Sequence, residues 1–371
     1  MTSLADVIGL LDGWYRPEWA QSWDSVGLVT GNQSAEIRKI HLAIDPTLPV
    51  AHEAIAMGAN LLVAHHPLWL GGVDRITGER GRVLTELQTA RCALFVAHTN
   101  ADVALRGVSD ALGAALGLRD LRVMSGEHEE LDQWVTHIPP EFTEQLLDAL
   151  ATVGAGRLGS YDRCAFIAEG IGTFRPGPGA EPYTGQIGEI ERVSEARVEF
   201  VASPRNRFEI ARVLRAVHPY EEPSFTVIPT TTPSKRGLGR VGELPEPMRL
   251  GQFVAHVARS LPQTAAGIRA TGNPDAVIRT VAVAGGSCLD HDGDAAGAGA
   301  DVFVTSDAKH HRAQDARLPI VDVPHWASEF PWTEDLGARL REALDSVSVS
   351  VSQLVTDPWT MAAGDRVDMG L

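Results

Sequence analysis

The sequence has too few cysteines for a disulfide framework or a cysteine-based zinc ribbon. Only Cys92, Cys164 and Cys288 occur among its 371 residues, an odd number at wide spacings. Hydrophobic runs are also short, since each breaks after a handful of residues at His, Gly or Asp, which excludes a membrane-spanning segment. Any bound metal must therefore use histidine and carboxylate ligands.

Basic clusters and targeting signals are equally scarce. The formal net charge is −16, and no basic run is longer than Lys235-Arg236, so we do not expect nucleic acid as a main partner. No basic residue precedes Arg16, and no hydrophobic stretch leads to a small-residue cleavage site. We therefore expect no secretory signal and a cytoplasmic location.

The composition is that of an ordinary globular protein, with 44% hydrophobic and 22% charged residues. A chain of 371 residues exceeds what one hydrophobic core usually serves, so two or three domains are expected. The first region alternates apolar strands with helices of about ten residues, which predicts a buried parallel sheet. The expected strands are 39–44, 60–64 and 93–97, and the expected helices are 48–58 and 80–90.

The same α/β alternation returns near the other end of the chain, and a different order lies between the two regions. The late strands are expected at 279–284, 302–305 and 320–323, with helices at 290–299 and 308–316. The middle region follows the order strand, helix, strand, strand, helix, strand, which is the ferredoxin-like βαββαβ pattern. Its expected elements are 131–138, 140–152, 163–174, 188–202, 204–217 and 224–228.

These patterns predict an α/β core made of two separated halves, with mostly parallel sheets, around an inserted ferredoxin-like domain. The polar, proline-containing segment 230–234 is expected to be the linker that returns the chain to the core. We place the first half of the core at 1–128, the insert at 129–230 and the second half at 231–371.

The strongest chemical signal is His65-His66-Pro67, which follows the apolar run 61–64 directly. Ligands bind open α/β sheets at the carboxyl ends of their strands. Two imidazoles at such an edge can serve metal ions, although paired histidines can also simply end a strand with hydrogen-bonded rings.

Two further clusters follow strands at equivalent positions. His98 and Asp102 come after the strand that ends at residue 97, and His325 and Glu329 come after the strand that ends at residue 323. His325 and Glu329 are spaced i, i+4, so they share a face if a helix begins there; a solvated surface pair is the alternative.

Together the clusters supply the ligands of a two-metal site. Zn²⁺, Fe²⁺ and Mn²⁺ accept imidazole nitrogen and carboxylate oxygen, and two neighbouring ions need terminal ligands and a bridging carboxylate. Such ions lower the pKa of a bound water and provide hydroxide, so hydrolysis is the natural chemistry. The candidate ligands are His65, His66, Asp102, His325 and Glu329. Nearby residues that can orient them, or serve a purely structural role, are His98, Asp307 and His311. No particular catalytic residue is assigned.

Several segments together resemble the Nif-three-like family, whose members are often called GTP cyclohydrolase 1 type 2 homologs. The matching segments are Trp23 to Leu28, Leu62 to Leu68, His98 to Asp102, Gly107 to Asp110, Ala300 to Asp307 with His311, and His325 to Glu329. The middle region resembles the PII-like insert of the longer bacterial members through residues 154–157, 172–176 and 218–223. The sequence departs from the family pattern at Ser25, Ala101, Arg106 and Ser306, where the family usually has Asn, Leu, Gly and Gly.

The resemblance implies a dinuclear metal site, carried onto the same five ligands, in a toroidal homohexamer with a small-molecule or nucleotide substrate. A hydrolase acting through a metal-bound hydroxide is one expectation, with GTP suggested by the family name alone. A non-catalytic metal carrier or regulatory scaffold is the other. The glycine-rich stretches 170–173 and 175–179 precede no helix, so we interpret them as a hairpin and a loop rather than a phosphate cradle. Trp69 and Trp326 flank the histidine clusters and are expected to line the pocket.

Overall fold

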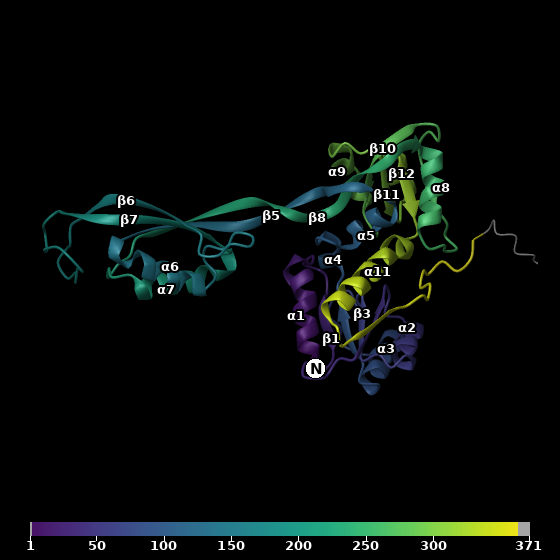
Figure 1. Ribbon diagram of the computed structural model, residues 1–371, viewed down its shortest axis with the longest axis horizontal. Helices are drawn as coiled ribbons and strands as arrows, with labels where there is room; N and C mark the ends of the chain where they lie inside the picture. Colours follow the sequence, from purple (N-terminus) through teal and green to yellow (C-terminus); the bar gives the residue numbers. More distant parts are fainter. Residues whose placement is uncertain (1, 363–371) are drawn as a thin grey trace, which may run out of the picture. The chain divides into compact units, whose positions relative to one another are not determined.

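The computed structural model describes residues 2–362, and the chain forms two compact units (Figure 1). One unit comprises Met1–Glu127 with Lys235–Leu371, and the other comprises His128–Ser234. Within residues 2–362, no helix is both long enough and apolar enough to cross a bilayer. The α/β class predicted from the sequence is confirmed.

The first sheet of the larger unit has the strand order β1-β4-β3-β2-β13. All neighbours are parallel except β1 and β4. The strands are β1 (Gly27–Thr30), β2 (Lys39–Ala43), β3 (Leu61–Ala64), β4 (Ala93–Val96) and β13 (Ser348–Val351). The helices around this sheet are α1 (Leu4–Trp14), α2 (Leu48–Ala56), α3 (Gly78–Thr89) and α11 (His325–Ala343), and the short helix η1 (Pro17–Trp19) follows α1.

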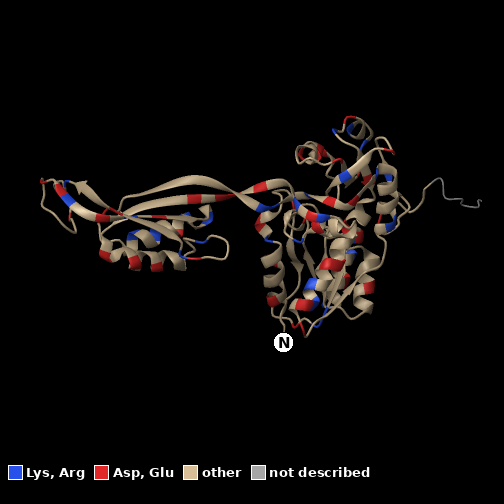
Figure 2. Cartoon of the chain, turned by 45° about the horizontal axis from the view of Figure 1, so that its top comes forward, with Lys and Arg blue, Asp and Glu red and all other residues tan. Residues whose placement is uncertain are grey.

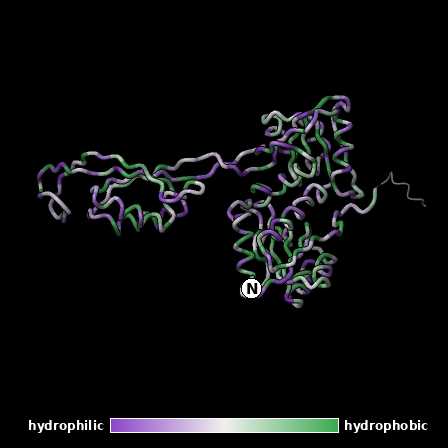
Figure 3. Tube along the Cα trace, in the orientation of Figure 1, coloured by the Kyte–Doolittle hydropathy of each residue, from purple (hydrophilic) through white to green (hydrophobic). Residues whose placement is uncertain are grey.

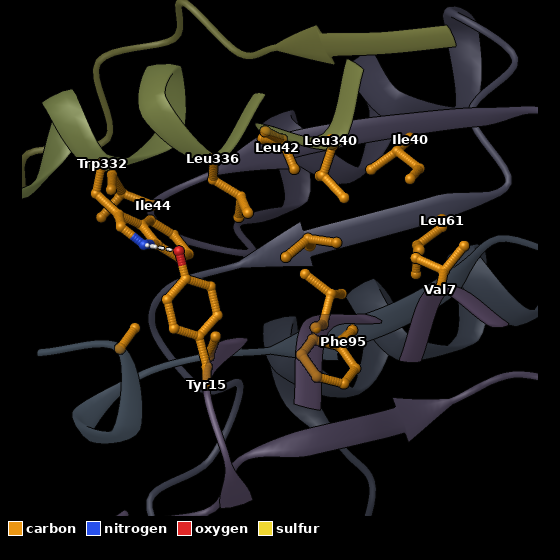
Figure 4. Packing of buried hydrophobic residues seen from close by; sticks show 14 of the residues in the cluster. Val7, Tyr15, Ile40, Leu42, Ile44, Leu61, Phe95, Trp332, Leu336 and Leu340 are labelled. Carbon is orange, nitrogen blue, oxygen red and sulfur yellow. Dashed lines mark hydrogen bonds between the residues drawn. The ribbon is translucent and has the colours of Figure 1, made fainter. Parts of the chain in front are cut away.

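Alternating side chains of β3 explain why helices cover both faces of this sheet. Leu61 and Val63 belong to the hydrophobic cluster formed with α1 and α11 (Figure 4), whereas Leu62 and Ala64 belong to the cluster formed with α2 and α3. Successive residues of a strand point to opposite faces, so a strand that is apolar throughout is buried on both sides. The hydropathy colouring shows apolar segments gathered in the strands of this unit (Figure 3).

The second sheet of the larger unit has the order β8-β10-β11-β12-β9, with β10, β11 and β12 parallel and the two outer strands antiparallel to their neighbours. The strands are β8 (Phe225–Arg249), β9 (Arg269–Ala270), β10 (Val277–Val283), β11 (Val302–Ser306) and β12 (Ile320–Val323). The helices are α4 (Thr99–Val103), α5 (Val108–Ala115), α8 (Leu250–Ser260), η4 (Leu289–His291), α9 (Asp292–Gly297) and α10 (His310–Gln314). Residues of α5 and α8 pack on one face of this sheet, and η4 and α9 pack on the other.

The smaller unit has the element order β5-α6-β6-β7-α7-β8, the order predicted for the middle region, and its strands lie in the order β6-β7-β5-β8. Trp134 and Phe200 from the sheet pack with Leu146 and Leu214 from the two helices. The elements are β5 (Arg119–Ile138), η2 (Pro140–Phe142), α6 (Thr143–Thr152), β6 (Ala165–Phe174), β7 (Glu191–Ala202), η3 (Pro204–Asn206) and α7 (Arg207–Val217).

The linker expected at 230–234 is wrong, because these residues form part of strand β8. The Thr230 hydroxyl donates to the Leu131 carbonyl oxygen at 3.0 Å, and Ser234 Oγ donates to Glu129 Oε1 at 3.3 Å. The burial of β8 alternates residue by residue through this segment. Threonine is a good strand former, so the polar composition that suggested a linker belongs to a solvent-exposed strand pair.

Candidate metal centre

The carboxyl ends of strands from both sheets of the larger unit carry the predicted ligands. His65 and His66 follow β3 directly, and their backbone N–H groups donate to the carbonyl oxygens of Ala43 and Ile44. Asp102 lies in α4, immediately after β4. His325 is the first residue of α11, immediately after β12, and Glu329 lies one turn further along this helix. The helix that sequence spacing required therefore forms, and Glu329 is buried in it.

Three of the other candidate ligands face the Glu329 carboxylate, which is only 3% exposed. Its Oε1 lies 2.9 Å from His325 Nε2 and 3.5 Å from His65 Nε2. Its Oε2 lies 3.1 Å from His66 Nε2. Asp102 Oδ1 is 3.6 Å from His65 Nε2. One carboxylate thus faces three imidazoles, as a bridging ligand would.

Every histidine of the cluster is held through its Nδ1 atom by an oxygen outside the cluster. His65 Nδ1 donates to the Ala97 carbonyl oxygen at 2.8 Å. The other three rings pair with carboxylates: His66 with Asp45 at 2.7 Å, His325 with Asp307 at 2.6 Å, and His98 with Asp24 at 2.9 Å. A hydrogen bond at Nδ1 fixes the orientation of the ring. In the neutral ring, the lone pair of Nε2 is then available to bind a metal ion.

Electrostatic interactions within the cluster shift the pKa values of its members. Burial alone would raise the pKa of Glu329, but the facing histidines, His66 foremost, hold it well below its usual range. Burial would lower the pKa of both His66 and His325, yet the Glu329 charge and the hydrogen-bonded carboxylates raise them to about 10 and about 11. Burial, together with the Glu329 charge, raises the pKa of Asp102 to about 7. The cluster therefore binds protons that a metal cation can displace.

Two buried polar atoms of the cluster, His65 Nε2 and Asp102 Oδ1, have no hydrogen-bond partner. Burying such atoms without a partner is costly, and metal coordination would satisfy both. Ring nitrogens of His65, His66 and His98 lie within 4.8 Å of one another, and so do ligand atoms of His66, His325 and Glu329. The residues therefore fit a divalent cation that accepts imidazole and carboxylate ligands.

A buried aromatic pair, Trp332 and Tyr15, lies next to the centre, and Figure 4 shows the hydrogen bond between the two rings. The Trp332 ring packs on His65 with centroids 5.1 Å apart, and its Nε1 donates to the Tyr15 hydroxyl at 3.1 Å. The Asn100 side chain donates to the Tyr15 carbonyl oxygen at 2.7 Å, which ties α4, the helix of Asp102, to the same pair. These contacts fix the position of the His65 ring and of the helix that carries Asp102.

The centre lies in the wall of a cavity of about 1310 Å³. His66, His98 and His325 line this cavity, as do Trp69 and Trp326, which confirms the expectation for the two tryptophans. A cavity of this size exceeds what a metal ion needs and has room for an organic molecule.

Two of the three accessory candidates join the centre, and the third lies apart from it. Asp307 and His98 take the positions described above, whereas His311 lies in α10 with an exposed side chain and a ring contact to His310. Sequence reasoning gave no role to Asp45 or Asp24, although Asp45 follows β2 at the same sheet edge as the histidines. The position of Asp45 just after a predicted strand could have identified it as a candidate site residue.

The fold and the site define an α/β protein with a histidine and carboxylate candidate metal centre between two sheets. The chain belongs to the Duf34/NIF3 (NGG1p interacting factor 3) family, whose model matches residues 2–358. The resemblance inferred from the sequence is thereby confirmed.

Similar proteins cover nearly the whole chain. A Mycobacterium leprae protein named GTP cyclohydrolase 1 type 2 homolog is 43% identical over 97% of this chain and 96% of its own length. A Bacillus subtilis protein of the same name is 34% identical over 95% and 97% of the two chains. The crystal structure of a Bacillus cereus protein related to NIF3 is similar with a TM-score of 0.76 and 35% identity, covering 97% and 99%. A Staphylococcus aureus protein structure gives a TM-score of 0.83 at 30% identity, with the same coverage.

Proposed function

We propose that this protein is a metal-dependent hydrolase with two divalent ions per chain. His65, His66, Asp102, His325 and Glu329 would hold the ions, and the Glu329 carboxylate would be the central ligand because it faces three of the imidazoles. Nitrogen and oxygen donors of this kind suit Zn²⁺, Fe²⁺ or Mn²⁺. A pair of such ions supplies hydroxide near neutral pH by lowering the pKa of a coordinated water.

The observation that carries this proposal is the position of the ligand cluster in the wall of a cavity of about 1310 Å³. A metal carrier needs ligands but has no need of a large chamber beside them. A hydrolase needs both, because the substrate must reach the metal ions. The cavity therefore favours catalysis over storage as the use of the centre.

The chain's own residues orient the ligands and the substrate. Asp45 and Asp307 hold the rings of His66 and His325 by their Nδ1 atoms, so that both Nε2 atoms face Glu329. His98 lines the cavity with its Nδ1 fixed by Asp24, so its ring is held in one orientation at the cavity wall. Fixed donors and acceptors of this kind position a substrate before reaction.

Reconstitution separately with Zn²⁺, Fe²⁺ and Mn²⁺, followed by turnover assays, tests this function. GTP belongs in the substrate panel because relatives carry the GTP cyclohydrolase name, alongside simple phosphoesters and aromatic amides. We expect release of formate, phosphate or amine that disappears in Glu329→Ala. An inert, fully loaded wild type across this panel would instead favour a metal carrier or regulatory scaffold.

We also propose a cytoplasmic, toroidal homohexamer in which the unit His128–Ser234 is a PII-like domain with an assembly or regulatory role. Support comes from the family resemblance, the βαββαβ element order and the free cysteines at 92, 164 and 288, which suit a reducing compartment. Light scattering coupled to size-exclusion chromatography should give six times the mass of one 39.8 kDa chain. A monomer or dimer at micromolar concentration would contradict the ring.

A further inference from the structure

Beyond the histidines of the metal centre, much of the cavity wall is aromatic and aliphatic. Three tryptophans, Trp69, Trp326 and Trp359, line the cavity together with leucine, proline and methionine side chains. Trp359 is 66% exposed, so one face of a large aromatic ring is open to solvent at the cavity wall. An open indole face is an apolar surface suited to stacking against another planar ring.

The segment that carries Trp359 is anchored to the core. After β13, Ser352 N–H donates to the Leu42 carbonyl oxygen at 2.8 Å, and the Thr356 hydroxyl donates to Asp45 Oδ2 at 2.5 Å. Asp357 then accepts from the Trp359 backbone N–H at 2.9 Å, which fixes a turn. Because Asp45 also holds His66, the segment is tied to a candidate metal ligand. Trp359 is thus exposed and yet held at the cavity wall.

Away from the metal-binding histidines, the charges of the cavity wall do not suit a group with several negative charges. Among the described residues that line the cavity, two are arginine, Arg80 and Arg269, and none is lysine. Arg269 already forms an ion pair with Asp322. Five carboxylates line the same cavity: Asp45, Glu79, Asp307, Asp322 and Asp357. A cavity that binds a polyphosphate usually presents several guanidinium or ammonium groups or a helix N-terminus with a glycine-rich loop. The part of the ligand that lies away from these histidines is therefore better matched by an uncharged group.

We propose that Trp359 forms an aromatic subsite of this cavity that binds a planar, uncharged ring of the substrate, with the bond to be hydrolysed directed toward His66 and His325, which line the same cavity. The second part of this statement rests on the proposed hydrolase function, whereas the binding of the ring does not. The subsite names the substrate class as an aromatic or heteroaromatic compound that carries a hydrolysable amide, ester or ring carbon–nitrogen bond. Trp359 is a specificity-determining residue of that subsite.

Binding of indole to the zinc-loaded full chain tests the subsite. Indole is planar, uncharged and a poor metal ligand, and cyclohexanemethanol serves as a non-planar probe of similar bulk. Ligand-observed NMR titration should give a lower dissociation constant for indole than for cyclohexanemethanol. Trp359→Ala should raise the indole dissociation constant about three- to tenfold, and Trp359→Phe should restore most of the affinity.

Phe208→Ala is the matched control, because Phe208 is a 77% exposed aromatic residue in the other unit. This variant should bind indole as the wild type does. Equal affinities for the two probes, or an indole affinity unchanged in Trp359→Ala, would overturn the subsite.

The same measurements separate this inference from the hydrolase proposal. Indole binding that depends on Trp359 supports the subsite even if no substrate of the turnover panel is hydrolysed. Indole binding that ignores Trp359 overturns the subsite even if turnover is found. Repeating the titration on Glu329→Ala should leave the effect of Trp359→Ala intact, since the ring contact does not involve the metal ligands.

Discussion

The two units of this chain differ in how they group carboxylates with basic side chains. In the unit His128–Ser234, arginines and carboxylates pair on the surface, as Arg163 does with Glu144 and Asp148. In the larger unit, carboxylates and imidazoles converge in a buried cluster around Glu329, and His65 Nε2 and Asp102 Oδ1 are left without a hydrogen-bond partner. Acidic and basic residues are otherwise interspersed over both units (Figure 2). The difference shows that the larger unit maintains an electrostatically costly site, which a bound cation would stabilise.

Glu329→Ala should have the largest effect on the metal centre. Removing the carboxylate that faces three histidines should cost at least one metal ion per chain, while the protein stays folded. Elemental analysis with circular dichroism measures both quantities. Glu199→Ala in the smaller unit, where Glu199 pairs with Arg197, is the control and should keep full metal content. Full occupancy in Glu329→Ala would rule out the bridging role.

Trp134→Ala should destabilise the smaller unit without affecting the metal. Trp134 is fully buried and stacks on Phe200 and Phe225 with centroids 5.9 and 5.6 Å away. Losing this ring should cost about 3–5 kcal/mol of unfolding free energy, measured by urea denaturation. Metal content measured in parallel should stay at the wild-type value. A loss of metal in this variant would mean that the two units depend on each other for the site.

Asp45→Asn should weaken metal binding without removing a ligand. The carboxylate orients His66 through Nδ1 and accepts from Thr356. Loss of such an orienting group typically lowers metal affinity about 10- to 100-fold, which competition with a chelator measures. Asp345→Asn, an exposed substitution outside the cavity lining, should leave the affinity unchanged. An affinity equal to that of the wild type in Asp45→Asn would show that Asp45 does not orient His66.

Metal binding should release protons from the cluster at pH 8. In the metal-free protein the pKa values of His66 and His325 are raised to about 10 and about 11, so both rings are protonated and both must lose a proton to bind metal. Metal affinity should therefore rise with pH up to about 10. Calorimetry in two buffers with different ionisation enthalpies counts the released protons, and a value of zero would contradict the assignment.

The same pKa shifts predict the direction in which the stability of the metal-free protein changes with pH. A histidine whose folded-state pKa is raised stabilises the fold fully below its unfolded-state value of about 6.5, and this contribution is lost as pH rises toward the folded-state value. Metal-free protein should lose stability between pH 7 and 10, and loaded protein should lose less. His218 in the smaller unit behaves differently, since burial lowers its pKa.

Arg106→Gly should have the smallest effect. Arg106 adopts a left-handed backbone conformation, with φ of 52°, at a position where the family usually has glycine. Glycine would relieve that conformation but lose the exposed ion pair with Asp335, so the unfolding free energy should change by less than about 1 kcal/mol. Arg163→Gly is the matched substitution in the smaller unit, because Arg163 has the same left-handed conformation, with φ of 55°. A large loss of stability or of metal in Arg106→Gly would assign this arginine a role in shaping the site.

The sequence predicted the strands that carry the site well, because each is a short apolar run that ends at a histidine or a turn residue. It did not predict the long polar extensions of β5 and β8, because alternating polar residues in an exposed strand pair have the composition of a linker. The i, i+4 spacing of His325 and Glu329 identified a shared helix face correctly, but only packing against both sheets decided that this face is buried.

The orienting carboxylates were harder to predict than the histidines they hold. Asp45 is 21 residues from His66, and Asp24 is 74 residues from His98. Hydrogen bonds over such separations depend on how the loops after neighbouring strands meet, which local sequence patterns do not encode. His311 illustrates the reverse case, since a histidine close in sequence to Asp307 has an exposed side chain in α10.

The metal stoichiometry of the wild-type chain tests the central claim most directly. Metal-free protein should be dialysed to equilibrium against Zn²⁺ and Mn²⁺ separately at pH 8, and bound metal should be counted per chain. The account predicts saturation at two ions per chain, with both bound ions lost on acidification as protons return to the histidines. Saturation below one ion per chain, or binding that is equally tight at pH 5 and pH 8, would contradict it.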